Sequence, residues 1–197
     1  MHFQNKVAVI TGSTAGIGEA VAEQLHKHGA KVVIVSRSSE QAKQKAKRLS
    51  SQGQQALGIG CDVSQPEQVR QMIDEVIKNF GRLDCAVNNA GLTGEHGKNI
   101  TEQTVENWDK VIATSLSGVF YCLKYEIPEM MKFGGSIVNL SAVNDSVLEF
   151  TPDASRYLTK ILVALNAFND TSEASIFDVC TPKEKGRKEY TLLTDEI

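Results

Sequence analysis

The sequence predicts an α/β protein: a parallel, doubly wound sheet enclosed between two layers of helices. Two observations lead to this fold class. Short, unbroken apolar runs alternate along the chain with longer segments in which apolar residues recur at helical spacing. The apolar runs lack an inside–outside alternation, which is typical of strands buried on both faces of a parallel sheet. Parallel neighbours need crossover connections, and helices in those connections cover both faces.

Strands are expected where short apolar runs are bounded by turn residues. The runs with this character lie at residues 7–10, 31–36, 56–63, 83–87, 136–140 and 176–180. The pattern is clear as far as about residue 145 and weaker beyond it. A short edge strand at 190–193 is a further expectation in the weaker part.

The clearest helix lies between the third and fourth strands. Its apolar residues, from Val69 to Phe80, recur at steps of three and four and define one face. Ser64 and Glu67 have the spacing of a capping box before it, and Gly81 ends it. The other expected helices run from Gly16 to a stop at Gly29, from a cap at Ser38 or Ser39 to Gly53, from 105 to about 131 with a kink at Pro128, and over 156–168.

The composition is that of an ordinary globular protein. The 197 residues, 41% of them hydrophobic and 23% charged, can hold one good-sized core, so we expect a single domain over 1–197. A net charge of −3 gives no reason to expect nucleic acid or an anionic membrane as a partner. The sequence has no apolar run of about 18 residues and no room for a signal peptide before the first strand, so we expect a cytoplasmic protein.

The cysteines and histidines do not have the spacing of metal ligands. No C-x-x-C pair occurs, so we expect reduced thiols and no metal. The residues concerned are Cys61, Cys85, Cys122, Cys180, His2, His26, His28 and His96.

A glycine-rich turn, TGSTAGIG, joins the first strand to the first helix. Glycines let the backbone come close to a ligand, and the free N–H groups at a helix start favour a negative charge. The spacing is G-x-x-x-G-x-G and differs from the common dinucleotide fingerprint G-x-G-x-x-G. The turn alone therefore predicts either a phosphate site or a plain strand-to-helix loop.

Five motifs stand in register along the chain. They are TGSTAGIG at 11–18, CDV at 61–63, NNAG at 88–91, GVF at 118–120 and SIVNLS at 136–141. With these motifs the sequence resembles the short-chain dehydrogenase/reductase family, closely from 1 to about 142 and poorly thereafter. The resemblance implies a Rossmann-type fold, with three α/β/α layers, that binds NAD or NADP at the carboxyl ends of its strands.

The resemblance also implies the cofactor-binding residues. The glycine turn would hold the pyrophosphate and the adjoining ribose, the CDV motif would meet the adenine, and the NNAG motif would line the nucleotide channel. The positions concerned are Gly12, Ser13, Thr14, Gly16, Ile17, Gly18, Asp62, Val63, Asn89, Ala90 and Gly91. As the alternative, Asp62 would only cap the loop into the next helix, and Asn88 with Asn89 would only tie two strand ends together.

The choice of cofactor depends on the end of the second strand. An enzyme that uses NAD would place an acidic side chain there for the ribose 2′-OH. This chain has Arg37 between two serines, and a guanidinium can pair with a 2′-phosphate. We therefore expect NADP(H), with NAD(H) as the other possibility and a solvated surface arginine as the alternative role.

The resemblance implies a catalytic tyrosine, a lysine four residues later that lowers the pKa of the tyrosine, a serine on the substrate oxygen and an asparagine that holds a relay water. Each position departs from the family pattern. Ser115 stands in place of the asparagine, and Ala142 in place of the serine, beside Ser141. Tyr157 is followed by Lys160 at a spacing of three. Tyr157, Lys160 and Ser141 are the candidate catalytic residues.

Two functions follow. The first is an NADP(H)-dependent oxidoreductase that transfers hydride between the nicotinamide and a small carbonyl or secondary-alcohol substrate. The second is a catalytically impaired dinucleotide-binding sensor or scaffold, and a third interpretation is that residues beyond about 145 are not the natural continuation of the fold. A homo-oligomer is expected by resemblance, with 108–125 as a candidate face, although core burial would explain the same apolar residues.

Overall fold

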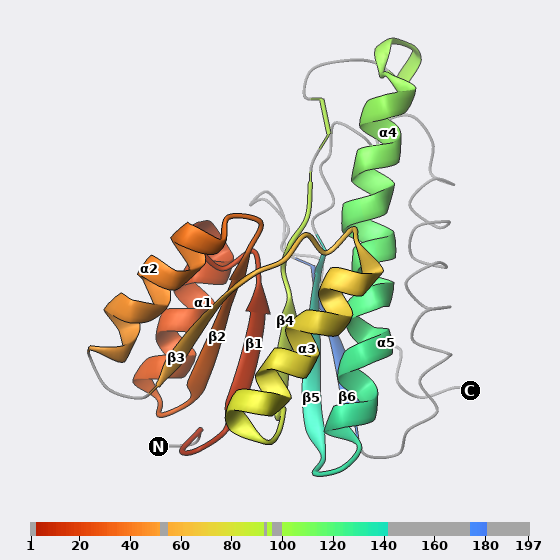
Figure 1. The fold of residues 1–197 in the computed structure, drawn as a ribbon. Coiled ribbons are helices and arrows are strands. Elements are labelled where there is room, and N and C mark those ends of the chain that lie inside the picture. Colours follow the sequence, from red (N-terminus) through yellow and green to blue (C-terminus); the bar gives the residue numbers. More distant parts are fainter. Residues whose placement is uncertain (1–2, 52–54, 93, 96–99, 142–173, 181–197) are drawn as a thin grey trace, which may run out of the picture.

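The strands lie side by side in one sheet with the order β3-β2-β1-β4-β5-β6 (Figure 1). The computed structural model describes residues 3–51, 55–92, 94–95, 100–141 and 174–180. Within them every strand pair is parallel. The strands are β1 (Val7–Thr11), β2 (Lys31–Ser36), β3 (Ala56–Gly60), β4 (Cys85–Asn88), β5 (Gly135–Ser141) and β6 (Ala174–Cys180).

The strand order reverses between β1 and β4. The chain moves outward from β1 to β3, returns to pair β4 with the other side of β1, and moves outward again to β6. In such sheets the connections leave in opposite directions at the reversal and open a crevice at the carboxyl ends of the strands. The predicted doubly wound parallel sheet is confirmed, and the reversal lies at the carboxyl ends of β1 and β4, where sheets of this kind bind their ligands.

Helices cover the sheet in two layers (Figure 1). The helices α1 (Gly16–Lys27) and α2 (Ser39–Ser50) cover one face, and α3 (Pro66–Phe80) and α5 (Gly118–Met130) cover the other. Successive residues of β1 alternate between the two cores: Val7 and Val9 pack toward α3 and α5, whereas Ala8 and Ile10 pack toward α1 and α2. All four are apolar because both faces are buried, which explains the unbroken apolar runs.

Local signals explain most helix ends. The Ser38 hydroxyl caps α2 by accepting a hydrogen bond from the Gln41 amide at 3.3 Å, as predicted. The predicted capping box of Ser64 and Glu67 is wrong. The helix α3 begins one residue later, at Pro66, because proline has no N–H to satisfy and its fixed φ suits the first helical position. The Ser64 hydroxyl instead donates to Asp62.

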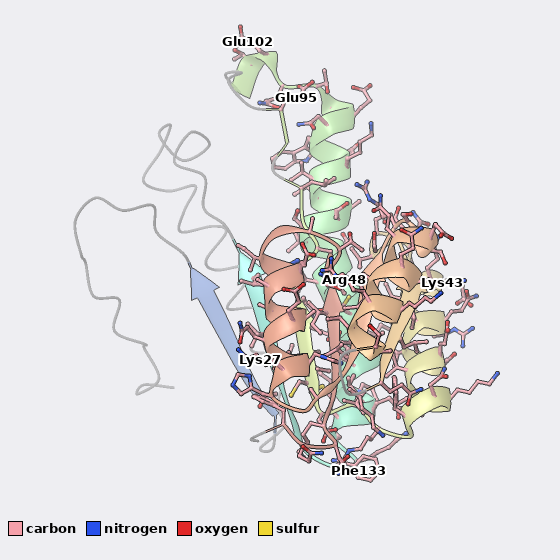
Figure 2. The ribbon with its side chains drawn as sticks, turned by 90° about the vertical axis from the view of Figure 1, so that its left-hand side faces the viewer. Lys27, Lys43, Arg48, Glu95, Glu102 and Phe133 are labelled. Atoms are coloured by element: carbon pink, nitrogen blue, oxygen red, sulfur yellow. The ribbon has the colours of Figure 1, made fainter. Side chains whose placement is uncertain are left out.

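The long predicted helix is three consecutive segments: α4 (Val105–Ile112), the π-helical stretch η2 (Ala113–Ser117), and α5. Pro128 lies inside α5, and the departure from α-helical geometry comes earlier, in η2. Figure 1 shows α4 projecting past the carboxyl ends of the strands, and it buries none of its side chains. Figure 2 shows Glu95 and Glu102 at this projecting end and Phe133 at the opposite end of the molecule.

Two predicted elements, the helix at 156–168 and the edge strand at 190–193, lie outside the described residues. The sixth strand is present as β6. None of the helices in the described ranges is long and apolar enough to cross a membrane.

Candidate functional site

The glycine turn folds over the carboxyl end of β1. Gly12 and Gly16 have φ of +65° and +61°, which is the left-handed region that glycine adopts without steric cost. Between them the Ser13 side chain is fully buried. Its hydroxyl donates to the Ile10 carbonyl at 2.6 Å and accepts from the Val35 amide at 3.0 Å. The hydroxyl therefore anchors the turn to β1 and β2 and faces away from the cleft.

The helix α1 begins within this turn. Ala15 occupies the position before its first residue, and among the described residues no side chain caps its first turn. The first N–H groups of a helix have no partner inside the helix, and the helix dipole makes this end positive. An uncapped helix start at the crevice of a parallel sheet suits a phosphate or diphosphate group.

Asn89 joins the turn to the end of β4. Its Nδ2 donates to the carbonyl of Thr11 at 2.9 Å and to that of Gly12 at 3.0 Å. Thr11 Oγ1 in turn accepts from the amides of Asn89 and Ala90, both at 3.0 Å. A Cβ atom on Gly18 would lie 2.4 Å from Asn89 Nδ2 and 2.5 Å from the Gly12 carbonyl oxygen, so this junction has no room for a side chain.

A cleft of about 250 Å³ opens beside this junction. Eight of the residues predicted to bind the cofactor line it together: Gly12, Thr14, Arg37, Asp62, Val63, Asn89, Ala90 and Gly91. Four of its lining residues were not among the predicted ones: Ser36, Cys61, Leu92 and Thr114. Two of these could have been found from their position at a strand end: Ser36 is the last residue of β2, and Cys61 directly follows β3.

The remaining predicted residues of the turn do not line the cleft. Ser13 and Gly18 are buried, and Ile17 is 57% exposed. Gly16 supplies the left-handed backbone at the start of α1. These residues shape the turn, and the Ser13 amide is already used, because it donates to the Val35 carbonyl at 3.1 Å.

The end of β2 presents a cation and hydroxyl groups to the cleft. Arg37 is exposed and lines the cleft beside Ser36. Ser36 Oγ accepts a hydrogen bond from the Ser38 amide at 3.3 Å, which turns the chain after the strand. No acidic side chain stands at 36–38, the place where an NAD-dependent enzyme would carry one.

Asp62 both lines the cleft and organises its own loop. Its Oδ1 accepts from the amide and the hydroxyl of Ser64 at 3.0 and 2.7 Å. The loop role that the sequence left as an alternative is therefore present together with the position at the cleft. The neighbouring Cys61 is an unreactive thiol, because burial and then the Asp62 charge raise its pKa to about 12.

Ser115 connects the π-helical stretch to the loop after β4. Its hydroxyl accepts from the Leu92 amide at 3.0 Å and donates to the Leu92 carbonyl at 3.2 Å. π-helical stretches inside α-helices are frequent at functional sites. Here the serine that stands in place of the expected asparagine fixes the wall of the cleft that Leu92 and Thr114 form.

The candidate catalytic residues are only partly placed. Ser141 ends β5, at the same carboxyl edge of the sheet as the cleft. Tyr157 and Lys160 lie outside the described residues. In the described ranges, no group of three or more His, Cys, Asp or Glu side chains is placed to hold a metal ion.

A buried carboxyl group below the cleft was missed. Glu126 of α5 has 0% exposure and accepts a hydrogen bond from Asn88. Its spacing from Val119 and Cys122 is i+7 and i+4, which places it on the buried face of α5. Helical spacing was the available signal, although a glutamate is seldom expected in a core.

Comparisons with known proteins identify the family of the chain. The family model described as short chain dehydrogenase matches residues 6–151. The chain belongs to the short-chain dehydrogenase family. The predicted family, and the Rossmann-type fold that it implies, are confirmed.

Individual curated relatives match between about 70% and 80% of this chain. The 3beta-hydroxysteroid dehydrogenase of Mediterraneibacter gnavus is 36% identical over 157 residues, which cover 80% of this chain and 56% of the relative. The chain spans about half the length of such curated relatives.

Solved structures similar to this chain carry different cofactors. A metagenomic short-chain oxidoreductase in complex with NADP has a TM-score of 0.80 and 26% identity, over 93% of this chain and 85% of that one. An NAD⁺-bound xylitol dehydrogenase has a TM-score of 0.73 and 26% identity, over 84% and 64%. Likeness within the family is thus compatible with either dinucleotide, and the choice has to come from this chain's own residues.

Proposed function

We propose that the chain binds NADP(H) in the cleft and transfers hydride between the nicotinamide and a carbonyl or secondary-alcohol substrate. The observation that carries this proposal is the uncapped start of α1 in a glycine turn, which Asn89 holds at the carboxyl end of the sheet. When bound, the nicotinamide ring is the donor or acceptor of the hydride. The protein binds, orients and exchanges a proton.

The residues present fit a dinucleotide. The first turn of α1 offers amide hydrogens and a positive dipole for the diphosphate. Asp62 and Val63 line the cleft from the loop after β3, where the adenosine end would lie, and Asn89 to Gly91 line it from the loop after β4. The roles assigned to these residues by resemblance therefore become part of the proposal.

Arg37 supports the choice of NADP(H) over NAD(H). Its guanidinium lies at the cleft rim and can form charge-assisted, bidentate hydrogen bonds with a 2′-phosphate. We expect Arg37→Asp to raise the Kd of NADPH by about 10- to 100-fold, the equivalent of about 1.5–3 kcal/mol, and to change that of NADH little. Fluorescence titration measures both constants.

A matched control separates this contact from a change in net charge. Lys43 is an exposed cation on α2, and Lys43→Asp makes the same charge change away from the cleft (Figure 2). It should leave both Kd values within about twofold. Equal NADPH affinity of Arg37→Asp and the parent protein would make Arg37 a solvated bystander.

For the proton transfer we propose Tyr157, with Lys160 and Ser141. Tyr157 would exchange a proton with the substrate oxygen, and the Lys160 ammonium would lower the tyrosine pKa from its ordinary value of about 10. Ser141 would donate a hydrogen bond to the same oxygen. Absorbance at 340 nm with a panel of ketones, aldehydes and secondary alcohols detects turnover, which Tyr157→Phe should abolish.

A second function, dinucleotide binding without turnover, is favoured by Ser115, Ala142 and the three-residue spacing from Tyr157 to Lys160. The same assay separates the two. NADPH binding with no change at 340 nm across the panel would select the sensor or scaffold. Absence of any nucleotide binding would contradict both functions.

The proposal also includes a homo-oligomer and a cytoplasmic location. Trp108 and Phe120, on the helical segment from α4 to α5, are 57% and 46% exposed, so core burial does not explain them. A contiguous exposed apolar patch marks a protein interface, and we propose that these two side chains belong to one between subunits. Sedimentation velocity of the protein, compared with a Trp108→Ser variant, tests the oligomer.

A further inference from the structure

Glu126 lies in the core between α5 and the strands β4 and β5. It has 0% exposure. The other buried residues of α5 are uncharged: Gly118, Val119, Cys122, Leu123 and Met130. An isolated carboxylate is costly in such surroundings, because taking the charge out of water loses its hydration.

The Asn88 amide contacts this carboxyl group. Its Nδ2 donates to Glu126 Oε2 at 3.0 Å and to Asn139 Oδ1, across the strands, also at 3.0 Å. Both amide hydrogens are thereby used. This orientation of the amide is assigned from the two contacts, because the flipped form would set Asn88 Oδ1 against the Asn139 Oδ1 acceptor.

Two oxygens of the same pair of groups are left over. Asn88 Oδ1 and Glu126 Oε1 are buried and have no hydrogen-bond partner in the described part of the chain. Both are acceptors if the carboxyl group is ionised, so neither can satisfy the other. A proton on Oε1 makes it a donor, and the amide that already contacts the carboxyl group carries the free acceptor.

We propose that Glu126 is a neutral carboxylic acid whose hydroxyl donates to Asn88 Oδ1, and that this acid–amide pair positions the end of β4 beneath the cleft. Two antiparallel hydrogen bonds, N–H to Oε2 and O–H to Oδ1, then satisfy every polar atom of the pair. Glu126 is fully buried and is not among the residues that line the cleft, so we assign it a positioning role.

The charges around Glu126 agree with a neutral acid. Burial raises the pKa of Glu126 and the hydrogen bond from Asn88 lowers it. Burial has the larger effect, and the pKa is raised to about 7. On its own helix, Cys122 lies one turn away, and the pKa of that thiol is raised by burial first and then by Glu126. Among the elements packed against α5, η2 and β5 contain no ionisable side chain and β4 contains only Cys85. The ionisable residues of α3 are all exposed: Glu67, Arg70, Asp74, Glu75 and Lys78.

The pair is connected to the cleft through one peptide bond. Asn88 is followed by Asn89, whose side chain holds the carbonyls of Thr11 and Gly12. Ionisation of Glu126 removes the donor to Asn88 Oδ1 and places a charge in the core, so the end of β4 loses a fixed support. An effect on the cleft rests on the proposed function, whereas the acid–amide pair itself does not.

Glu126→Gln is the informative variant. Glutamine has nearly the same shape, its Oε1 accepts from Asn88 Nδ2, and its Nε2 donates to Asn88 Oδ1 without any proton that titrates. Glu126→Leu removes both bonds. If the pair exists, the Glu126→Gln variant should be as stable as the parent protein at low pH and more stable at high pH. The Glu126→Leu variant should be less stable than Glu126→Gln at both.

Infrared difference spectroscopy of the protein minus Glu126→Gln reads the protonation directly. We expect a carboxylic-acid C=O band at pH 6 that disappears as the pH rises through about 7. A carboxylate band at pH 6 would overturn the proposal. A free, water-exposed acid would titrate near 4.5, so the midpoint is itself a test.

Thermal unfolding gives an independent measure. Because the folded-state pKa of about 7 lies above the ordinary 4.5, the stability contributed by the protonated acid declines as the pH rises between these values and levels off above 7. The Tm of the parent protein should therefore fall relative to that of Glu126→Gln by about 3–5 °C from pH 6 to pH 8.5. A constant Tm difference, or a glutamine variant as unstable as Glu126→Leu at pH 6, would contradict the pair.

NADPH affinity tests the positioning role. We expect the Kd of the parent protein to rise about threefold from pH 6 to pH 8.5 relative to that of Glu126→Gln, the equivalent of a shift of about half a pKa unit on binding. An unchanged ratio of the two constants would remove the positioning role. If NADPH does not bind at all, the proposed function fails, and the infrared and thermal results still decide whether the acid–amide pair exists.

Discussion

At the amino end of the sheet, Asp84 is buried beside β4, and its carboxylate accepts hydrogen bonds from Lys6, Arg82 and the Val7 amide. At the carboxyl end, the first turn of α1 has no side-chain cap among the described residues, and Arg37 is exposed at the cleft. The strands thus have paired charged groups at their amino ends and available polar groups at their carboxyl ends. Buried charged groups that pair with one another stabilise the fold, whereas polar groups without protein partners beside a cleft are available to bind a ligand.

The state of Asp84 illustrates the first case. Burial alone would raise the pKa of Asp84, but the hydrogen bonds from Arg82, the Val7 amide and Lys6 outweigh it and hold the pKa below its ordinary value. Arg82 also stacks on the Phe133 ring, 5.0 Å from its centroid, at the end of the molecule away from α4 (Figure 2). The charged groups at the amino end therefore satisfy one another, and the hollow of about 230 Å³ beside them is lined by Lys6, Asp84 and Phe133, among others.

The largest effect on NADPH binding is expected at Gly18. In Gly18→Ala the new methyl group would overlap the Gly12 carbonyl and Asn89 Nδ2, so the turn has to move. We expect the Kd of NADPH to rise by about 100-fold, as for an overpacked site that costs about 3 kcal/mol. Fluorescence titration measures it.

Gly81→Ala is the control for a general loss of stability. Gly81 ends α3 with φ of +75° and open space around it, so alanine strains the backbone far from the cleft. It should lower Tm without changing the Kd of NADPH. Full NADPH affinity in Gly18→Ala would show that the turn does not hold the cofactor.

The opposite pattern is expected at Asp84. Asp84→Ala leaves the Val7 amide without its partner and breaks two ion pairs, so it should lower the free energy of unfolding by about 2–3 kcal/mol and leave the Kd of NADPH within about twofold. Urea denaturation measures the first quantity. Asp84→Asn, which keeps an acceptor for Val7, should lose about half as much.

The lowered pKa of Asp84 gives a pH dependence with a defined sign. The charged carboxylate stabilises the fold at pH values above its ordinary 3.8, and this contribution is lost as the pH falls through the lower folded-state pKa. The free energies of the parent protein and Asp84→Asn should therefore converge in acid. A loss of NADPH affinity in either variant at neutral pH would break the comparison.

A smaller effect is expected for Asn89→Ala. It removes the two bonds that hold the Thr11 and Gly12 carbonyls, and we expect a rise of about tenfold in the Kd of NADPH, about 1.4 kcal/mol. Asn79→Ala is the control, because Asn79 is exposed on α3 and bonds only to the Glu75 carbonyl among the described residues. Equal affinity of the two variants would mean that the junction is not needed for binding.

The smallest effect is expected for Ser115→Ala. The Leu92 amide and carbonyl lose a partner but can reach water, since Ser115 and Leu92 are only half-buried. We expect a rise of about threefold in the Kd of NADPH. Ser117→Ala, in the same π-helical stretch, should change nothing, and an equal effect of the two variants would exclude a specific role of the Ser115 hydroxyl.

The elements that the sequence predicted correctly are those whose residues follow a local pattern. The apolar runs predicted β1 and β2, because both faces of these strands are buried. The glycines at 12 and 16 predicted the turn that follows β1. The third strand was expected over 56–63 but ends at Gly60. The Cys61 amide still donates to the Ser36 carbonyl of β2, and the chain beyond it lines the cleft.

The parts that were not predicted depend on distant partners. The inward position of the Ser13 hydroxyl requires the Val35 amide of the next strand. The burial of Glu126 requires the amides of Asn88 and Asn139, which come from two other elements. A local pattern gives the period of a helix, but it does not show which polar side chains find partners in the core. Tyr157 and Lys160 stay predictions.

The proposed cofactor site requires the amides around the start of α1 to hold the diphosphate. Titration of ¹⁵N-labelled protein with NADPH, followed by amide chemical shifts, tests it most directly. We expect saturable shifts of the amides from Thr14 to Gly18 and unchanged amides at Val7 and Asp84, at the other end of the sheet. Shifts confined to the amino end, or no shifts at the start of α1 when NADPH is bound, would contradict the account.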